Sequence, residues 1–150
     1  MRIFPTLDAL GEAVGEHLGH GSWHEITQQE IDLFAEATDD HQWIHVDRDR
    51  ARAGPFGAPV AHGYLTLSLI PRLVRDVYAV RDLAMGINYG LDKVRFPTPV
   101  TVGSRVRAGA ELVEFTDFPP GKRAVVKVTV EIEGHPKPAC VAETVILLIP

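Results

Sequence analysis

The chain has 150 residues, which fits one compact domain spanning residues 1–150. Hydrophobic residues make up 45% and charged residues 23%, which excludes a disordered chain, and a net charge of -5 gives no overall positive field for nucleic acid. The single cysteine, Cys140, and a proline and an acid near the N-terminus, where a signal peptide needs an apolar run, favour a cytoplasmic protein. No membrane span is expected, because the chain lacks an uncharged apolar run of about eighteen residues.

Helical patterns occupy the first half of the chain. The first predicted helix begins after Thr6 and ends near Gly19 or Gly21, with these apolar residues facing inward: Leu7, Leu10, Val14 and Leu18. Thr27 and Glu30 form a capping-box pattern for a second helix, which should end where residues 38–40 begin. Asp47 is expected to cap a short helical turn through Ala53.

The segment from Gly63 to about Tyr78 predicts the most buried helix. Its first turns are apolar on nearly every side, so other structure must surround it. Pro71 lacks an amide hydrogen and should kink or interrupt this helix.

The second half of the chain predicts strands. Apolar residues alternate with polar ones through 126–132, and residues 84–96, 104–115 and 139–149 also have strand character. Short turn-rich connections favour antiparallel pairing. The expected class is therefore α+β, with an antiparallel sheet curled around the buried helix.

Asp40 and His45 lie in the densest polar cluster, residues 39–47. Five residues apart, they would point about 140° away from each other on a regular helix, so they can share a target only in an irregular turn. A carboxylate beside an imidazole forms a general acid/base pair near neutral pH. The alternative is a solvated loop that caps a helix.

His62 and Gly63 stand where the buried helix begins. A helix N-terminus presents unpaired amides, and glycine lets a ligand approach the backbone closely. The Gly63 amide could then stabilise a developing oxyanion. Alternatively, Gly63 only permits close packing and His62 caps the helix.

Other kinds of site find less support. His41 and His45 are four residues apart, but no HExxH pattern or cysteine partner accompanies them, so no metal is expected. Cys140 lies in an apolar strand, and the chain has neither a Gly-x-Ser-x-Gly elbow nor a glycine-rich nucleotide loop.

Residues 34–47 and 54–63, taken together and in this order, resemble the MaoC-like dehydratase family, which includes (R)-specific enoyl-CoA hydratases. Residues 88–97 are similar to those of single-domain members. The resemblance implies a hot-dog fold, a sheet wrapped around a long central helix, and a homodimer. It also implies reversible syn hydration of trans-2-enoyl-CoA to (R)-3-hydroxyacyl-CoA. Asp40 and His45 match the catalytic pair, Gly63 matches the oxyanion amide, and no cofactor is needed because CoA belongs to the substrate.

The chain departs from the family pattern at two positions. Gln42 replaces the usual Asn and Trp43 replaces the usual Pro, so Gln42, with His62, is expected to have a supporting role. Four residues are candidates for binding the substrate, the last two for the CoA phosphates: Asn88, Tyr89, Lys93 and Arg95.

Two alternatives to the hydratase remain open. A hot-dog thioesterase would direct water at the thioester carbonyl instead of Cβ. A non-catalytic acyl-thioester-binding scaffold would keep ligand binding without turnover when Asp40 and His45 are changed.

Overall fold

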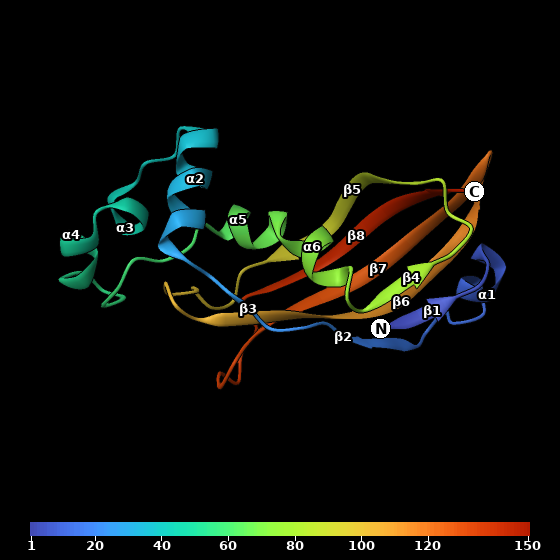
Figure 1. Ribbon diagram of the computed structural model, residues 1–150, viewed down its shortest axis with the longest axis horizontal. Helices are drawn as coiled ribbons and strands as arrows, with labels where there is room; N and C mark the ends of the chain where they lie inside the picture. Colours follow the sequence, from blue (N-terminus) through green and yellow to red (C-terminus); the bar gives the residue numbers. More distant parts are fainter.

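A curved, largely antiparallel sheet forms the body of the computed structural model, which describes all 150 residues (Figure 1). Its strands follow the order β2-β6-β7-β8-β5, and β3 pairs with a further part of β6. The bounds are β2 (His17–His20), β3 (His24–Glu25), β5 (Met85–Arg95), β6 (Arg105–Phe118), β7 (Gly121–Ile132) and β8 (Cys140–Ile149). The predicted α+β class with an antiparallel sheet is confirmed.

Alternation along β7 places one face of the sheet in the core. Val126, Val128 and Val130 are almost fully buried, whereas Lys127 between them is exposed. Alternate side chains of a strand point to opposite faces, so this pattern turns one face of β7 toward the helices and the other toward solvent.

The predicted buried helix lies across this sheet as two short helices, α5 (Gly63–Ser68) and α6 (Ile70–Val74) (Figure 1). Leu69 is both the C-cap of α5 and the N-cap of α6, and Pro71 stands in the first turn of α6. The expected interruption at Pro71 is confirmed, but the helical segment ends at Val74 and not near Tyr78. Pro71 cannot donate to a carbonyl one turn earlier, and Tyr78 begins a strand.

The N-terminal segment differs from the prediction. α1 (Leu7–Gly11) begins after the Thr6 cap but ends well before Gly19, and His17–His20 form a strand. Gly15 has a φ of +87°, which ends the helical path, and Leu18 is buried from the strand instead. β1 (Arg2–Phe4) and β4 (Tyr78–Val80), which the sequence patterns did not predict, form a separate parallel pair.

Three helices form a lobe beyond one end of the sheet: α2 (Gln28–Thr38), α3 (Trp43–Val46) and α4 (Arg48–Arg52) (Figure 1). The predicted capping box is present, because the Thr27 hydroxyl accepts from the Glu30 amide while the Glu30 carboxylate accepts from the Thr27 amide. Asp47 caps α4 as predicted. This lobe carries the polar cluster of residues 39–47.

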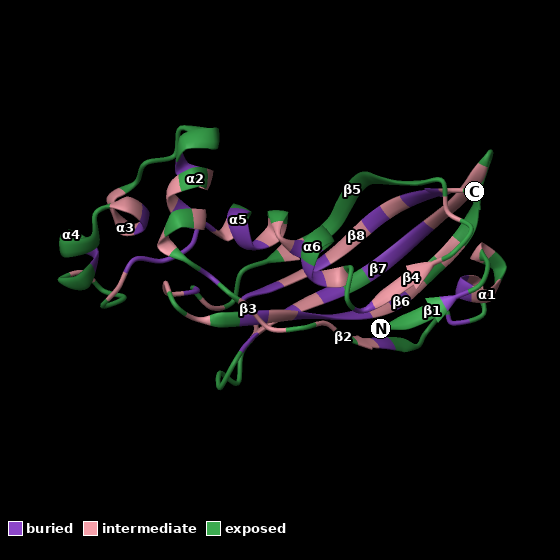
Figure 2. Ribbon diagram, viewed as in Figure 1, coloured by how far each residue is buried: buried purple, intermediate pink, exposed green.

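β5 forms one edge of the sheet and is exposed along its length, except at Val94 (Figure 2). Apolar residues that are 42–62% exposed follow one another along it: Met85, Ile87, Tyr89 and Leu91. An exposed apolar edge strand is a template for pairing with another chain.

None of the helices combines the length and the apolar character that crossing a membrane requires.

Candidate active site

The segment that carries Asp40 is an irregular turn, as the spacing of the pair requires. α2 ends at Thr38, Asp39 takes a left-handed conformation with φ of 57°, and α3 begins only at Trp43. The main-chain amide of Gln42 donates to the Asp40 carboxylate at 3.4 Å. The turn therefore escapes the regular helical geometry that would have separated Asp40 from His45.

Two hydrogen bonds to main-chain carbonyl groups hold His45, one made by its ring and one made to its own carbonyl. Its Nδ1 lies 2.6 Å from the Val60 carbonyl oxygen, and the Val60 amide in turn donates to the Ile44 carbonyl at 3.0 Å. The Gln28 side chain on α2 donates to the His45 carbonyl at 2.8 Å. Since a carbonyl can only accept, Nδ1 carries the hydrogen and Nε2 of the neutral ring is left as a base.

Asp40, His45 and His62 converge. A carboxylate oxygen of Asp40 and one ring nitrogen of each histidine lie within 4.8 Å of one another. Asp40 is exposed, whereas the two histidines are buried. The imidazoles of His45 and His62 stack with centroids 3.8 Å apart. Three such atoms could also coordinate a divalent cation. The sequence predicts that no metal binds, and this stays a prediction.

Burial sets the ionisation of His45. Removal of the ring from water lowers its pKa below the ordinary 6.5, and neighbouring His62 acts in the same direction. The Val60 carbonyl and the Asp40 carboxylate oppose this by favouring the charged ring. The net effect keeps His45 neutral, in the form that accepts a proton, at pH 7.

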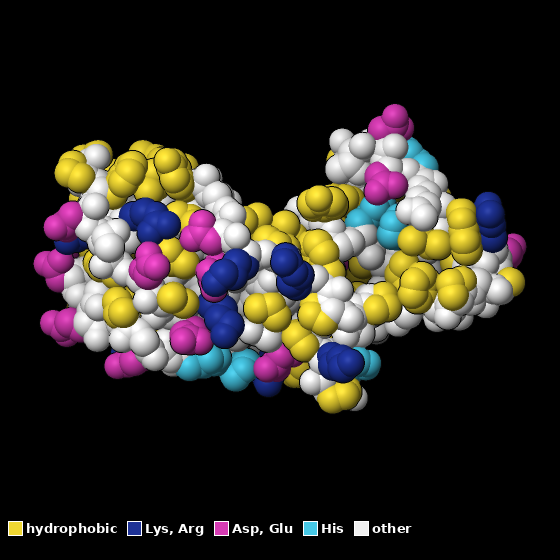
Figure 3. Space-filling view, turned by 180° about the vertical axis from the view of Figure 1, so that it is seen from behind, with side chains coloured by type: hydrophobic (Ala, Val, Ile, Leu, Met, Phe, Trp, Pro, Cys, Tyr) yellow, Lys and Arg dark blue, Asp and Glu magenta, His cyan; other side chains and the backbone are white.

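A cavity of about 340 Å³ opens beside His45 and Gly63. It is walled mainly by apolar side chains, including Ile44, Phe56 and Phe96. Figure 3 shows a hollow between the helical lobe and the body of the molecule, with hydrophobic and histidine side chains along it. The Gly63 amide, at the start of α5, has no carbonyl one turn earlier in that helix. The lobe and the helix thus bring a base and a main-chain donor to one cavity.

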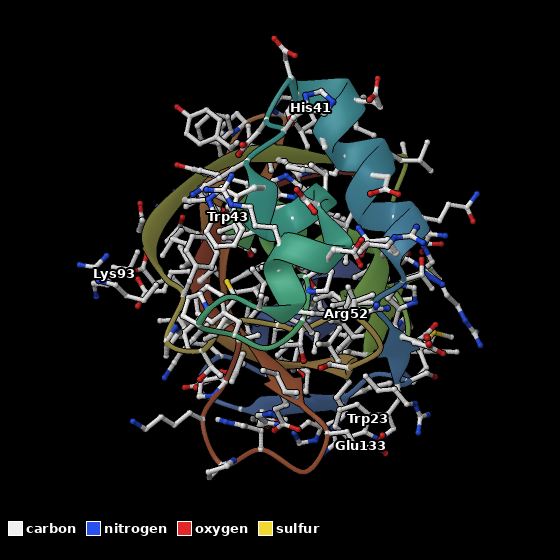
Figure 4. All side chains as sticks on the ribbon, turned by 90° about the vertical axis from the view of Figure 1, so that its left-hand side faces the viewer. Trp23, His41, Trp43, Arg52, Lys93 and Glu133 are labelled. Atoms are coloured by element: carbon white, nitrogen blue, oxygen red, sulfur yellow. The ribbon has the colours of Figure 1, made fainter.

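The four substrate-binding candidates lie elsewhere along β5. Asn88 and Tyr89 line a second, larger apolar cavity of about 790 Å³, between β5, β8 and α6. Lys93 pairs with Glu143 at 3.3 Å, and Figure 4 shows it pointing outward. Arg95 donates to the carbonyl of Val94. Neither of these two cations lines a cavity described above, so their phosphate-binding role stays a prediction.

The two departures from the family pattern have different surroundings. The Gln42 side chain is exposed and makes no hydrogen bond, so its supporting role stays a prediction. Trp43, labelled in Figure 4, lies against Gly54, where an added Cβ would come within 2.9 Å of the indole. The Arg50 guanidinium lies 4.3 Å from the centroid of the ring. Trp43 therefore joins α3 to α4 and the following loop.

Cys140 and His41 lie outside the candidate active site. Cys140 is fully buried, and desolvation raises the pKa of its thiol to about 11, so it is not a nucleophile at neutral pH. His41, between Asp40 and Gln42, is exposed and bonds Glu36 at 2.9 Å. Neither belongs to the cavity.

Comparison with known proteins decides the family. A model described as "MaoC like domain" matches residues 9–134. The chain belongs to the MaoC-like dehydratase family. It is 55% identical over 147 residues to 3-hydroxyacyl-thioester dehydratase Z of Mycobacterium tuberculosis, covering 97% of each chain. It is 45% identical to nodulation protein N of Rhizobium leguminosarum bv. viciae, covering 95% of this chain and 91% of that one.

A solved structure agrees with the fold of this MaoC-like protein. The (R)-hydratase from A. caviae superimposes with a TM-score of 0.72 at 24% identity, covering 91% of this chain and 96% of that one. The family resemblance and the hot-dog fold are confirmed, and the dehydratase names of relatives support a hydro-lyase.

Several residues that hold the site were not predicted. Gln28 and Val60 position His45 through main-chain groups, and Phe34 packs its ring 4.9 Å from His62. Contacts to backbone carbonyls leave no signature in a single sequence. Only the pattern at Thr27–Glu30, which fixes the start of α2, indicated where Gln28 would lie.

Proposed function

We propose that this protein is an (R)-specific enoyl-CoA hydratase/dehydratase, which reversibly adds water across trans-2-enoyl-CoA to give (R)-3-hydroxyacyl-CoA. The observation that carries the proposal is the convergence of the Asp40 carboxylate with the ring of His45, whose Nε2 is left as a base, beside an apolar cavity. The names of the relatives, 3-hydroxyacyl-thioester dehydratase and 3-hydroxybutyryl-CoA dehydratase, support it.

In this mechanism the pair holds one water. His45 removes a proton from the water as its oxygen attacks Cβ. Asp40 orients the water and relays this same proton from His45 to Cα, which returns both groups to their resting forms. Delivery of both groups from one side gives syn addition. The two groups titrate as a coupled unit, so the division of proton transfer between them belongs to the pair.

The Gly63 amide would polarise the thioester carbonyl. Charge moves from the double bond onto this oxygen as water attacks, and a donor in an apolar cavity stabilises such charge more than it would in water. Gly63 shares its cavity with His45, so one end of the conjugated system would meet the amide while the other meets the base.

The direct test supplies crotonyl-CoA and records loss of the enoyl-thioester absorbance together with release of free thiol. A hydratase removes the absorbance without releasing thiol, whereas a thioesterase releases thiol. Thiol release at the rate of absorbance loss would replace the hydratase proposal with the thioesterase.

Variants of the pair test the site. Asp40→Asn and His45→Gln should each lower turnover at least about 100-fold, the range expected for lost acid/base chemistry. His41→Gln is the matched control because His41 is exposed and lies in the same turn. Near-normal hydration by both pair variants would contradict the proposal, and ligand binding without turnover in the parent protein would favour the scaffold.

We also propose a homodimer that pairs through β5. This strand has an unpaired edge, exposed apolar side chains and an apolar cavity beside it. Ile87→Lys should yield monomers in analytical ultracentrifugation, because a charge would then be buried at the interface. Leu33→Lys, on an exposed apolar residue of α2, should not. A monomeric parent, or an Ile87→Lys dimer of undiminished stability, would refute this arrangement.

A further inference from the structure

His62 is more deeply buried than either member of the proposed catalytic pair. Its side chain comes from the residue before α5, and it is only 2% exposed. One face of the ring stacks on His45 at 3.8 Å and 23° between planes, and Phe34 packs 4.9 Å away. The ring therefore has little freedom to rotate.

The edge of this ring holds the turn that carries Asp40. His62 Nε2 lies 2.9 Å from the Asp40 carbonyl oxygen, across 22 residues of sequence. The other side-chain hydrogen bonds of residues 39–42 stay local: His41 bonds Glu36, and the Asp40 carboxylate accepts from Gln42. The His62 bond thus joins the exposed turn to the buried start of α5.

The acceptor fixes the tautomer of His62. A carbonyl oxygen accepts only, so Nε2 carries the hydrogen, and Nδ1 is a buried atom without a partner. A hydrogen on Nδ1 would have no acceptor there. His62 therefore has a lone pair but no proton to give at Nδ1, and its one donor is committed to the Asp40 main chain.

We infer that His62 is a positioning residue, which ties the main chain of Asp40 to the start of α5 and sets the carboxylate against the ring of His45. The inference rests on the proposed hydration for its kinetic consequence. A misplacement of about 1 Å in a catalytic group can lower a rate about 100-fold. A single bond that holds an exposed turn is a place where such a displacement arises.

Three substitutions distinguish the effect of the His62–Asp40 hydrogen bond from that of the packing of the His62 ring. In His62→Gln the amide nitrogen reaches the position of Nε2 and can donate to the Asp40 carbonyl. In His62→Asn the amide lies one bond-length nearer the backbone, at the position of Nδ1, and cannot reach it. His62→Phe keeps the stacked ring and removes the donor.

The kinetic expectation follows from that difference. His62→Asn and His62→Phe should lower kcat about 10-fold to 100-fold with KM within about threefold of the parent value, while His62→Gln stays within about threefold in kcat. If His62→Phe does not fold, the Asn and Gln variants still decide, because both bury one amide and differ only in reach. Equal kcat in these two, or a parent-like kcat in His62→Asn, would overturn the inference.

A second measurement does not depend on turnover. The ¹³C resonance of the Asp40 carbonyl reports its hydrogen bond, so it should move in His62→Asn and His62→Phe and return in His62→Gln. An unchanged resonance in all three variants would overturn the inference. If the parent protein hydrates no enoyl-CoA, the proposed function fails, whereas this resonance still tests the tie between His62 and Asp40.

Discussion

Substituting Gly63 with alanine tests the assignment of its amide in the most direct way. A Cβ at this position would lie 3.2 Å from two atoms of the Phe96 ring, and both residues line the cavity beside His45. That separation is shorter than the 3.5–4.0 Å of a relaxed carbon–carbon contact, so about 0.3 Å of movement is needed at least. The methyl group itself would enter the space next to the amide.

The effect on stability should be small. Overpacking in a rigid core costs about 1–3 kcal/mol, but Phe96 is 42% exposed and can move toward solvent. Replacing glycine by alanine near a helix start also gains up to about 1 kcal/mol from helix propensity. With these opposing effects, the Tm of a 150-residue chain should change by no more than about 4 °C.

The effect on activity should be large. Alanine keeps the main-chain amide, but its methyl group occupies the space in which the thioester oxygen would meet that amide. Loss of one oxyanion contact lowers kcat about 100-fold to 1000-fold, so Gly63→Ala should show a loss of this size at a nearly unchanged Tm. The double variant Gly63→Ala/Phe96→Ala tells pressure from Phe96 apart from blockage by the methyl group, because only the former is relieved. Full crotonyl-CoA hydration by Gly63→Ala would refute the assignment of the amide to the thioester oxygen.

Three further expectations follow from the same structure. Because burial holds the pKa of His45 below 6.5, kcat/KM for hydration should stay level from pH 8 down to about 6.5 and fall at lower pH; a fall that begins above pH 7 would contradict a neutral His45. Gln28→Leu removes the donor to the His45 carbonyl and should lower the free energy of unfolding in urea by about 1–2 kcal/mol, with exposed Gln29→Leu unchanged as the control. Gly54→Ala would put a Cβ 2.9 Å from the Trp43 indole, so it should destabilise the protein by about 1–3 kcal/mol and alter tryptophan fluorescence; an unchanged spectrum would show that the indole does not lie there.

Regular patterns with local causes were predictable from the sequence. The alternation through 126–132 appears as the buried face of β7, and the Thr27–Glu30 pattern appears as a complete capping box. In both cases the physical cause lies within a few residues of its effect, namely the pleat of a strand or the amides of one helical turn.

Segments whose conformation depends on distant partners were not predictable. The Leu7–Leu18 spacing suits a helix, but residues 17–20 pair with β6 instead, and Gly15 permits the turn that precedes them. The strand at Tyr78–Val80 exists because it lies beside Arg2–Phe4, more than seventy positions away. Neither partner can be inferred from local propensity.

The candidate site shows the same division. The residue types at Asp40 and His45 indicated acid/base chemistry, and the five-residue spacing required an irregular turn, which the structure contains. How the turn is held could not be predicted, because the Val60 carbonyl and the His62 ring approach it from elsewhere in the fold.

The different burial of Asp40 and His45 gives the two groups of the proposed pair different tasks. A buried imidazole with a lowered pKa is a base at neutral pH, but a positive ring in that position is poorly solvated once it has taken a proton. The nearby carboxylate offsets this by favouring the charged ring, and its exposure keeps it solvated while it does so. In Asp40→Asn the resting His45 should therefore remain a base, whereas the protonated intermediate becomes less stable. A variant that binds enoyl-CoA normally and turns over slowly is the expected result, and weakened binding with unchanged kcat would show that Asp40 acts on the substrate instead.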